Sequence, residues 1–279
     1  MSNHISGPVM RVEGLTKIYG VGCPLCSEST GPDYETNICG HCGSVVACAN
    51  ITFELCPDEV LGIVGESGSG KSTLVKMLHF DYEATAGTIS INDSAANVLS
   101  LSPFQKRQIR NTSMGIVYQN PHHGLRMEVS SGGNISERLI MAGWRNIRAM
   151  RERASYLLHK TEVPVTRMDE PPKNFSGGEQ QRVQISKALS NNPVILFLDE
   201  VTTGLDLSVQ ARVLDLIRGL QDDLHLSIIV VSHDLGVIRL LTTRTMVMKY
   251  GRVVESGLTD QILEDPQHPY TQLLVSSQL

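Results

Sequence analysis

The chain has 279 residues, a formal net charge of −5 and a pI near 6.0. Its length and its 41% hydrophobic content allow one large α/β domain with or without a small appendage. The acidic balance argues against a general nucleic-acid binder. Apolar runs such as residues 228–231 are far too short to cross a bilayer, and no basic-then-apolar signal pattern opens the sequence. We therefore expect a cytoplasmic protein that neither binds nucleic acid nor inserts into a membrane.

Alternating apolar residues mark residues 1–19 and 49–65. This period is typical of half-buried strands, so we expect an antiparallel edge sheet that leads into a buried strand at 60–64. Tyr19, at the end of the first segment, is a candidate core aromatic when taken by itself.

A polar segment, residues 20–47, interrupts these strands and contains two C-x-x-C pairs: Cys23, Cys26, Cys39 and Cys42. Each pair can form a thiolate knuckle, and two knuckles complete a tetrahedral Cys₄ shell for Zn²⁺. Because the segment has little core of its own, metal binding would supply its folding energy. Disulfides are disfavoured because the expected compartment, the cytoplasm, keeps thiols reduced. An iron–sulfur cluster would accept the same four ligands. We predict a zinc-ribbon-like insert, with His41 as a spectator and with Cys48 and Cys56 as small buried residues.

A glycine-rich loop follows the apolar run 60–64 and precedes a helical segment at 73–78. It matches G-x-x-x-x-G-K-[ST], in which glycines let backbone N–H groups converge on anionic oxygens at a helix N-terminus. A loop that merely turns a strand into a helix is the plain alternative, but the motif is complete and sits between a strand and a helix. Lys71 would reach the β- and γ-phosphates of a nucleoside triphosphate, and Ser72 would hold Mg²⁺. The nucleotide-binding residues predicted here are Gly65, Ser67, Gly68, Gly70, Lys71, Ser72 and Thr73.

Polar groups also stand at the ends of later elements. Gln119 follows the strand-like run 114–118, where its amide could reach Mg²⁺ and the attacking water. Residues 175–181 (F-S-G-G-E-Q-Q) open a helical pattern and offer a second anion-binding point. The buried run 194–198 delivers Asp199 and Glu200, and adjacent strand residues point to opposite sides. We assign Asp199 to Mg²⁺ and Glu200 to polarising the nucleophilic water.

His233 follows one more buried strand, 228–231, and is expected near the γ-phosphate end of the site, although alone it could be a satisfied strand-end histidine. The order of P-loop, glutamine, Ser-Gly-Gly, Asp-Glu and histidine resembles the ATP-binding cassette (ABC) ATPases over nearly the whole chain except residues 20–47. The resemblance implies ATP hydrolysis by one α/β P-loop domain spanning 1–279, with an antiparallel β subdomain and a parallel-sheet core. Val201 departs from the family's usual proline and Phe175 from its usual leucine; neither change removes a catalytic group.

The same resemblance implies roles for outlying residues. Tyr19 would stack on adenine, and His233 would be the γ-phosphate switch. Residues 203–206, ending in the nucleotide-site residue Asp206, would communicate between two sites. Because the family's composite site is closed by two protomers, Ser176 and Gly178 would contact ATP that is held by a second cassette, identical or paralogous.

Apolar residues at helical spacing predict an inserted helical subdomain over 120–175, ending at the Pro171-Pro172 break: Ile135, Leu139, Ile140, Ala154, Leu157 and Leu158. The subdomain also carries a basic strip, which we interpret as a solvated helix face: Arg145, Arg148, Arg151 and Arg153.

Two partner assignments compete. Residues 265–271 (D-P-Q-H-P-Y-T) resemble the tail of the motor subunits of membrane oligopeptide importers. Four other segments resemble the ATP-binding subunits of the soluble carbon–phosphorus lyase complex: residues 124–126, 132–139, 253–260 and 274–277. The segment after Gln119 is longer and more glycine-rich than an importer pattern, which favours the lyase subunit. Such a subunit would dock on the core complex and drive its conformational change without cutting the carbon–phosphorus bond. A third hypothesis, a stand-alone regulatory ATPase, is weaker, because such chains commonly join two cassettes and only one is present here.

Overall fold

The computed structural model describes residues 7–92 and 96–277. The chain divides into two compact units. Residues 1–106 and 229–279 belong to the first unit, and residues 107–228 form the second. Helix α2 (Pro103–Ser113) and strand β7 (Ser227–Val231) each cross a boundary between the units along the chain.

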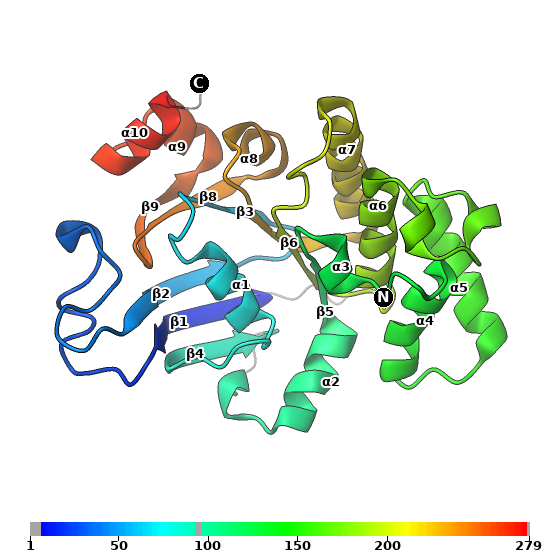
Figure 1. The fold of residues 1–279 in the computed structure, drawn as a ribbon, viewed down its shortest axis with the longest axis horizontal. Helices are drawn as coiled ribbons and strands as arrows, with labels where there is room; N and C mark the ends of the chain where they lie inside the picture. Colours follow the sequence, from blue (N-terminus) through cyan, green and yellow to red (C-terminus); the bar gives the residue numbers. More distant parts are fainter. Residues whose placement is uncertain (1–6, 93–95, 278–279) are drawn as a thin grey trace. The chain divides into compact units, whose positions relative to one another are not determined.

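A three-stranded antiparallel sheet begins the first unit, in the order β2-β1-β4 (Figure 1). Its strands are β1 (Met10–Tyr19), β2 (Val45–Leu55) and β4 (Ala86–Ile91). The alternation predicted for this region is confirmed in β2, where Ile51, Phe53 and Leu55 are buried while Thr52 and Glu54 face solvent. The sequence pattern does not predict β4, because only two of its residues, Ile89 and Ile91, are large and apolar.

The P-loop follows β3 (Val60–Val64), one of the other sheet strands of this unit. β3 is buried throughout and pairs in parallel with β8 (Arg244–Lys249), which pairs antiparallel with β9 (Arg252–Leu258). The 3₁₀ turns are η1 (Pro32–Tyr34) and η2 (Val98–Ser100). The helices are α1 (Lys71–Leu78), α8 (Leu235–Leu241), α9 (Thr259–Glu264) and α10 (Pro269–Ser276).

The second unit combines a parallel strand pair with helices (Figure 1). Its strands are β5 (Met114–Val117) and β6 (Ile195–Asp199), and every residue of β6 is buried. Its 3₁₀ turns are η3 (Val165–Arg167) and η4 (Pro172–Asn174). Its helices are α3 (Pro121–Gly124), α4 (Ser131–Met141), α5 (Ile147–Lys160), α6 (Gly177–Ala188) and α7 (Leu207–Leu224).

Helices α4 and α5 bury the apolar residues that predicted them, with one exception. Ile135, Leu139, Ala154 and Leu157 are inaccessible or nearly so, whereas Ile140 is half exposed on the far face of α4. The spacing of 3.6 residues per turn explains both outcomes, because residue 140 lies one step round the helix from residue 139.

Three of the four arginines of the basic strip lie on α5; Arg148 and Arg151 are exposed, as expected for a solvated face, whereas Arg153 is partly buried. Arg148 contacts Glu152 at 2.9 Å, and Arg151 forms a bidentate pair with Asp169 at 2.8 and 2.9 Å. Arg153 donates to carbonyl groups at the end of α6. In the part of the chain that the structure describes, no helix has both the length and the apolar character needed to span a bilayer.

Candidate functional site

The P-loop runs so close to neighbouring backbone that two of its glycines have no room for a side chain. A Cβ on Gly65 would lie 2.1 Å from the Met248 carbonyl oxygen, and one on Gly70 would lie 2.2 Å from the Ala47 carbonyl oxygen. Both glycines have positive φ angles, 150° and 106°. Glycine is therefore required at both positions by contact as well as by conformation.

Lys71 begins α1 and is buried inside this loop. Its ammonium group donates to the carbonyl oxygens of Gly65 at 2.6 Å and Glu66 at 2.9 Å. The hydroxyl of Ser69 is buried and has no hydrogen-bond partner among the described residues, while Ser67 is exposed at the loop tip. A cation, a free hydroxyl and a glycine-lined helix N-terminus fit the phosphates of a nucleotide.

The loop is braced from the C-terminal part of the chain. The Glu66 N–H donates to the Tyr270 hydroxyl at 3.0 Å, and burial raises the pKa of Tyr270. The Gly251 N–H donates to the Ser69 carbonyl oxygen at 3.0 Å. Sequence reasoning missed both braces, because no local signal joins residues that lie so far apart in the chain.

Two other predicted residues of the first unit lie on its surface. His233 is exposed directly after β7, and the N–H of the preceding Ser232 donates to the Ile63 carbonyl oxygen at 3.2 Å, next to the end of β3. Tyr19 is 39% exposed and meets the Tyr82 ring edge-on at 6.3 Å between ring centres. It is therefore not a core aromatic.

In the second unit, Ser176 caps the N-terminus of α6. Its backbone N–H donates to the Glu179 carboxylate at 2.9 Å, and this hydrogen bond lowers the pKa of Glu179. The Ser176 side chain remains exposed. Gly178 packs against α7, since a Cβ there would lie 2.5 Å from Val209 Cγ1. Phe175, which stands where the family usually has leucine, is buried, and the Arg167 guanidinium carbon lies 4.0 Å from the centre of its ring.

Helix α6 also holds the segment that carries Gln119. The Gln184 side chain accepts from the Tyr118 N–H, and the Gln181 side chain donates to the Tyr118 carbonyl oxygen at 3.4 Å. Both glutamines are buried. Gln181 ends the segment 175–181 singled out from the sequence, but its contact with Tyr118 was not predicted, and Gln184 was overlooked. Gln119 itself is exposed. The Ser-Gly-Gly segment and the glutamine loop are thus tied to one helix.

The two adjacent acids differ in their surroundings. Asp199 is the last residue of β6 and is 7% exposed, whereas Glu200 lies beyond the strand with a left-handed φ of 50°. The direction of Glu200 is therefore set by this turn and not by the strand alternation that the sequence led us to expect. Left-handed glutamate is uncommon and costs energy, and such strain is concentrated at functional sites. Further along the same loop, Asp206 is exposed at the N-cap of α7.

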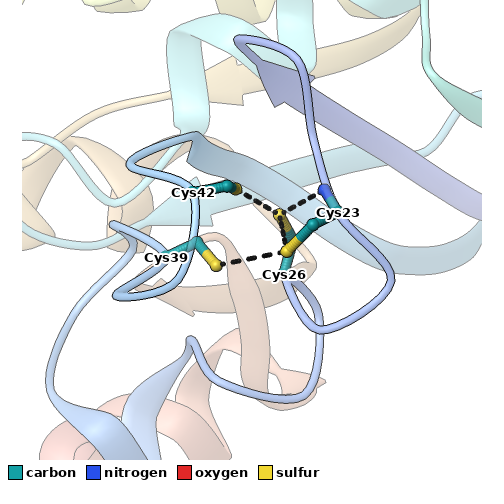
Figure 2. A group of neighbouring side chains, drawn as sticks. All are labelled: Cys23, Cys26, Cys39 and Cys42. Carbon is teal, nitrogen blue, oxygen red and sulfur yellow. Dashed lines mark hydrogen bonds between the residues drawn. The ribbon is translucent and has the colours of Figure 1, made fainter.

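The four insert cysteines converge on one point from two loops (Figure 2). Their sulfurs all lie within 4.8 Å of one another, and three of the separations are 3.4, 3.6 and 3.7 Å. A disulfide would need about 2.05 Å between sulfurs, whereas tetrahedral thiolates about 2.3 Å from Zn²⁺ lie about 3.8 Å apart. The cluster therefore has the dimensions of a metal site.

The thiols of the cluster differ in acidity. A hydrogen bond with Ser29 lowers the pKa of Cys39 to about 6, whereas burial raises the pKa of Cys23. Cys48 is buried, as predicted, and its thiol donates to the Gly70 carbonyl oxygen at 3.6 Å. Cys56 is exposed after β2, so its predicted burial is wrong.

Comparison with known proteins identifies the family. The sequence model described as "ABC transporter" matches residues 48–203. The chain belongs to the ABC transporter family. This cassette is 51% identical over 231 residues to the phosphonates utilization ATP-binding protein PhnK of Escherichia coli, covering 83% of this chain and 91% of that protein. It is 34% identical to the dipeptide transport ATP-binding protein DppF of Haemophilus influenzae, covering 99% of this chain and 80% of that protein.

Solved structures agree with this assignment. The dimeric bacterial ABC transporter cassette MJ0796 has a TM-score of 0.75 at 26% identity, covering 90% of this chain and 98% of that one. The cassette fold and ATP hydrolysis predicted from the motifs are thereby confirmed. The matched family region begins at residue 48, so all four clustered cysteines precede it.

We expect Gly70→Ala to abolish ATP binding, because the added methyl group would collide with the Ala47 carbonyl. The measurement is titration with a fluorescent ATP analogue. Gly219→Ala is the matched control: it lies exposed in α7, a Cβ there meets nothing within 4 Å, and alanine should stabilise the helix by about 0.5–1 kcal/mol. Normal binding by Gly70→Ala would contradict the tight contact.

Proposed function

We propose that this cassette is the ATP-hydrolysing subunit of a soluble carbon–phosphorus lyase complex, where it drives conformational change in the core complex. The observation that carries the proposal is its 51% identity to the phosphonates utilization protein PhnK, over 91% of that protein's length. The peptide import ATP-binding protein of Brucella abortus is 40% identical to this chain, and the alignment covers 72% of that protein's length. The cassette would work in the cytoplasm and would not cleave the carbon–phosphorus bond itself.

The residues present support an ATP site of the kind predicted. The P-loop from Gly65 to Thr73 would hold the phosphates, and Tyr19 is exposed for stacking on adenine. Bound Mg²⁺ would neutralise phosphate charge, and the oxygen donors of Ser72, Gln119 and Asp199 are of the hard type that it prefers. Glu200 would polarise the attacking water, and His233 would sense the γ-phosphate.

A second cassette would complete this site. Ser176 is exposed at the N-terminus of α6, and Gly178 lies in the first turn of that helix, where backbone N–H groups have no intrahelical partner. This end of α6 is therefore suited to receive a nucleotide from outside the second unit. A related cassette is dimeric in its solved structure. Binding of two Mg-ATP would close the pair, with the loop ending at Asp206 linking the sites, and hydrolysis would reopen it.

The segment after Gln119 is the surface we assign to the core complex. Helix α3 exposes His122 and His123, and the loop that follows is organised by the buried side chain of Asn134. Asn134 accepts from the Arg126 N–H at 2.8 Å and donates to the Val129 carbonyl at 2.9 Å. A loop fixed in this way presents a defined shape to a partner.

The cysteine cluster is assigned to structural Zn²⁺. The insert exposes its larger apolar side chains, so apolar burial contributes little to its folding: Val21, Leu25, Tyr34 and Ile38. Four convergent thiols supply the tetrahedral sulfur shell that zinc prefers, and metal coordination would hold the insert together.

Two observations favour a second candidate, the ATPase subunit of an oligopeptide-type importer. The dipeptide transport protein DppF aligns with 99% of this chain, and residues 265–271 resemble the importer tail. In that case the segment after Gln119 would receive a membrane partner.

We expect Glu200→Gln to bind ATP normally but to hydrolyse it on the order of 10²-fold more slowly, because the group that polarises water is lost. Steady-state turnover and nucleotide binding measure the two effects separately. Glu162→Gln, an exposed glutamate of the same unit, should keep wild-type turnover. Unchanged turnover in Glu200→Gln would refute the assignment.

Metal analysis of the purified protein should find about one zinc ion per chain. Cys26→Ser should lose this metal, whereas Cys56→Ser, which alters an exposed cysteine outside the cluster, should keep it. If the purified protein is brown and contains iron with little zinc, the site holds an iron–sulfur cluster and the zinc assignment is wrong.

Affinity purification from phosphate-starved cells tests the partner. We expect lyase subunits to be recovered with the cassette. Recovery of integral membrane permeases without lyase subunits would decide for the importer.

A further inference from the structure

The cysteine cluster is packed directly on the strand that borders the P-loop. Cys26 and Cys39 are buried together with Val46 and Ala49, two residues of β2. Ala47 lies between those two residues, and its carbonyl oxygen is the atom that leaves no room at Gly70. A shift of this part of β2 would therefore change the space available to the P-loop.

A second connection runs through Arg252, the first residue of β9. Its guanidinium donates to the carbonyl oxygens of Ser27 and Thr30, in the loop that follows the first cysteine pair. The Thr30 hydroxyl donates to the Cys26 carbonyl oxygen at 2.7 Å. Gly31 lies against the same side chain, since a Cβ there would be 2.6 Å from Arg252 Nε. The Arg252 side chain is therefore held in place by backbone groups of the insert.

The neighbouring residue joins Arg252 to the P-loop. Gly251 donates its N–H to the Ser69 carbonyl oxygen at 3.0 Å and accepts from the Ala49 N–H at 2.8 Å. A pocket of about 180 Å³ beside this contact is lined by Asn37 of the insert together with P-loop residues Glu66 to Ser69. The β8–β9 turn therefore contacts the insert, β2 and the P-loop.

We propose that the four-cysteine cluster is an effector site for a thiophilic divalent cation of the zinc class, and that cation binding raises the affinity of the P-loop for ATP. The proposal rests on the zinc site proposed above. The bound cation fixes the loop that carries Ser27 and Thr30, and this loop orients Arg252 and Gly251. Gly251 in turn positions the Ser69 carbonyl, and with it the backbone N–H groups that receive phosphate.

Coupling between two binding sites is reciprocal and commonly amounts to about 5- to 150-fold in affinity. Removal of the cation should therefore weaken ATP binding, and Mg-ATP should strengthen cation binding by the same factor. Arg252 acts here as a positioning residue, since it contacts the insert and lies next to Gly251 without belonging to the predicted nucleotide site.

The test uses the full-length protein, loaded with zinc or stripped of it by a chelator, and titrated with a fluorescent ATP analogue. We expect the Kd of the wild type to rise about tenfold on stripping. Zinc-loaded Arg252→Ala should keep its zinc but bind the analogue more weakly than the zinc-loaded wild type, and stripping should raise its Kd by a smaller factor than in the wild type, because only the contact through β2 remains. Arg239→Ala removes an exposed arginine paired with Glu264 in the same unit and should behave as wild type.

Two results would overturn the proposal. One is a wild-type protein that binds zinc stoichiometrically yet has the same Kd for the analogue with and without it; the metal site would then stand and the coupling would fail. The other is zinc-loaded Arg252→Ala with wild-type affinity, a comparison that remains decisive if stripped protein precipitates. Protein that binds no zinc when reloaded would instead remove the metal site on which the proposal rests.

Discussion

The contact of the P-loop with two backbone carbonyl groups constrains much of the first unit. Gly65 faces the Met248 carbonyl and Gly70 faces the Ala47 carbonyl, each with no space for a methyl group. The loop can therefore keep its shape only while β2 and β8 stay in place around it. The hydrogen bonds from Glu66 to Tyr270 and from Gly251 to Ser69 hold it from the C-terminal side. A nucleotide cradle of this kind depends on segments far from its own motif.

Because the shape of the P-loop depends on β2 and on the β8–β9 turn, the contacts of the cysteine insert with these segments bear on nucleotide binding. An insert with exposed apolar side chains and a core made of thiols would be a poor brace unless a metal fixed it. It is placed on β2 and on Arg252, which are the two routes that lead to the P-loop. A segment fixed there by a bound metal would influence nucleotide binding without touching the nucleotide.

The second unit shows a comparable arrangement around α6. The N-terminus of this helix presents Ser176, and its buried glutamines hold Tyr118 just before Gln119. A rigid helix that joins the two loops can transmit a shift of one to the other. The strained backbone at Glu200 lies in the same unit, at the end of the buried strand β6. These are the parts expected to change when a partner or a second cassette binds.

The sequence by itself determined the ATPase chemistry, the family and the four-cysteine grouping, because each is written as short-range spacing: G-x-x-x-x-G-K-S, Ser-Gly-Gly, Asp-Glu and C-x-x-C. It could not reveal β4, the exposure of Cys56, the turn at Glu200 or the buried Gln181 and Gln184, since each depends on what packs against it. Only the tertiary structure decided that Tyr270 and Gly251 hold the P-loop and that the insert is joined to it through β2 and Arg252. The physical reason is that these contacts link residues distant in the chain, and local propensity carries no information about which distant backbone groups will meet.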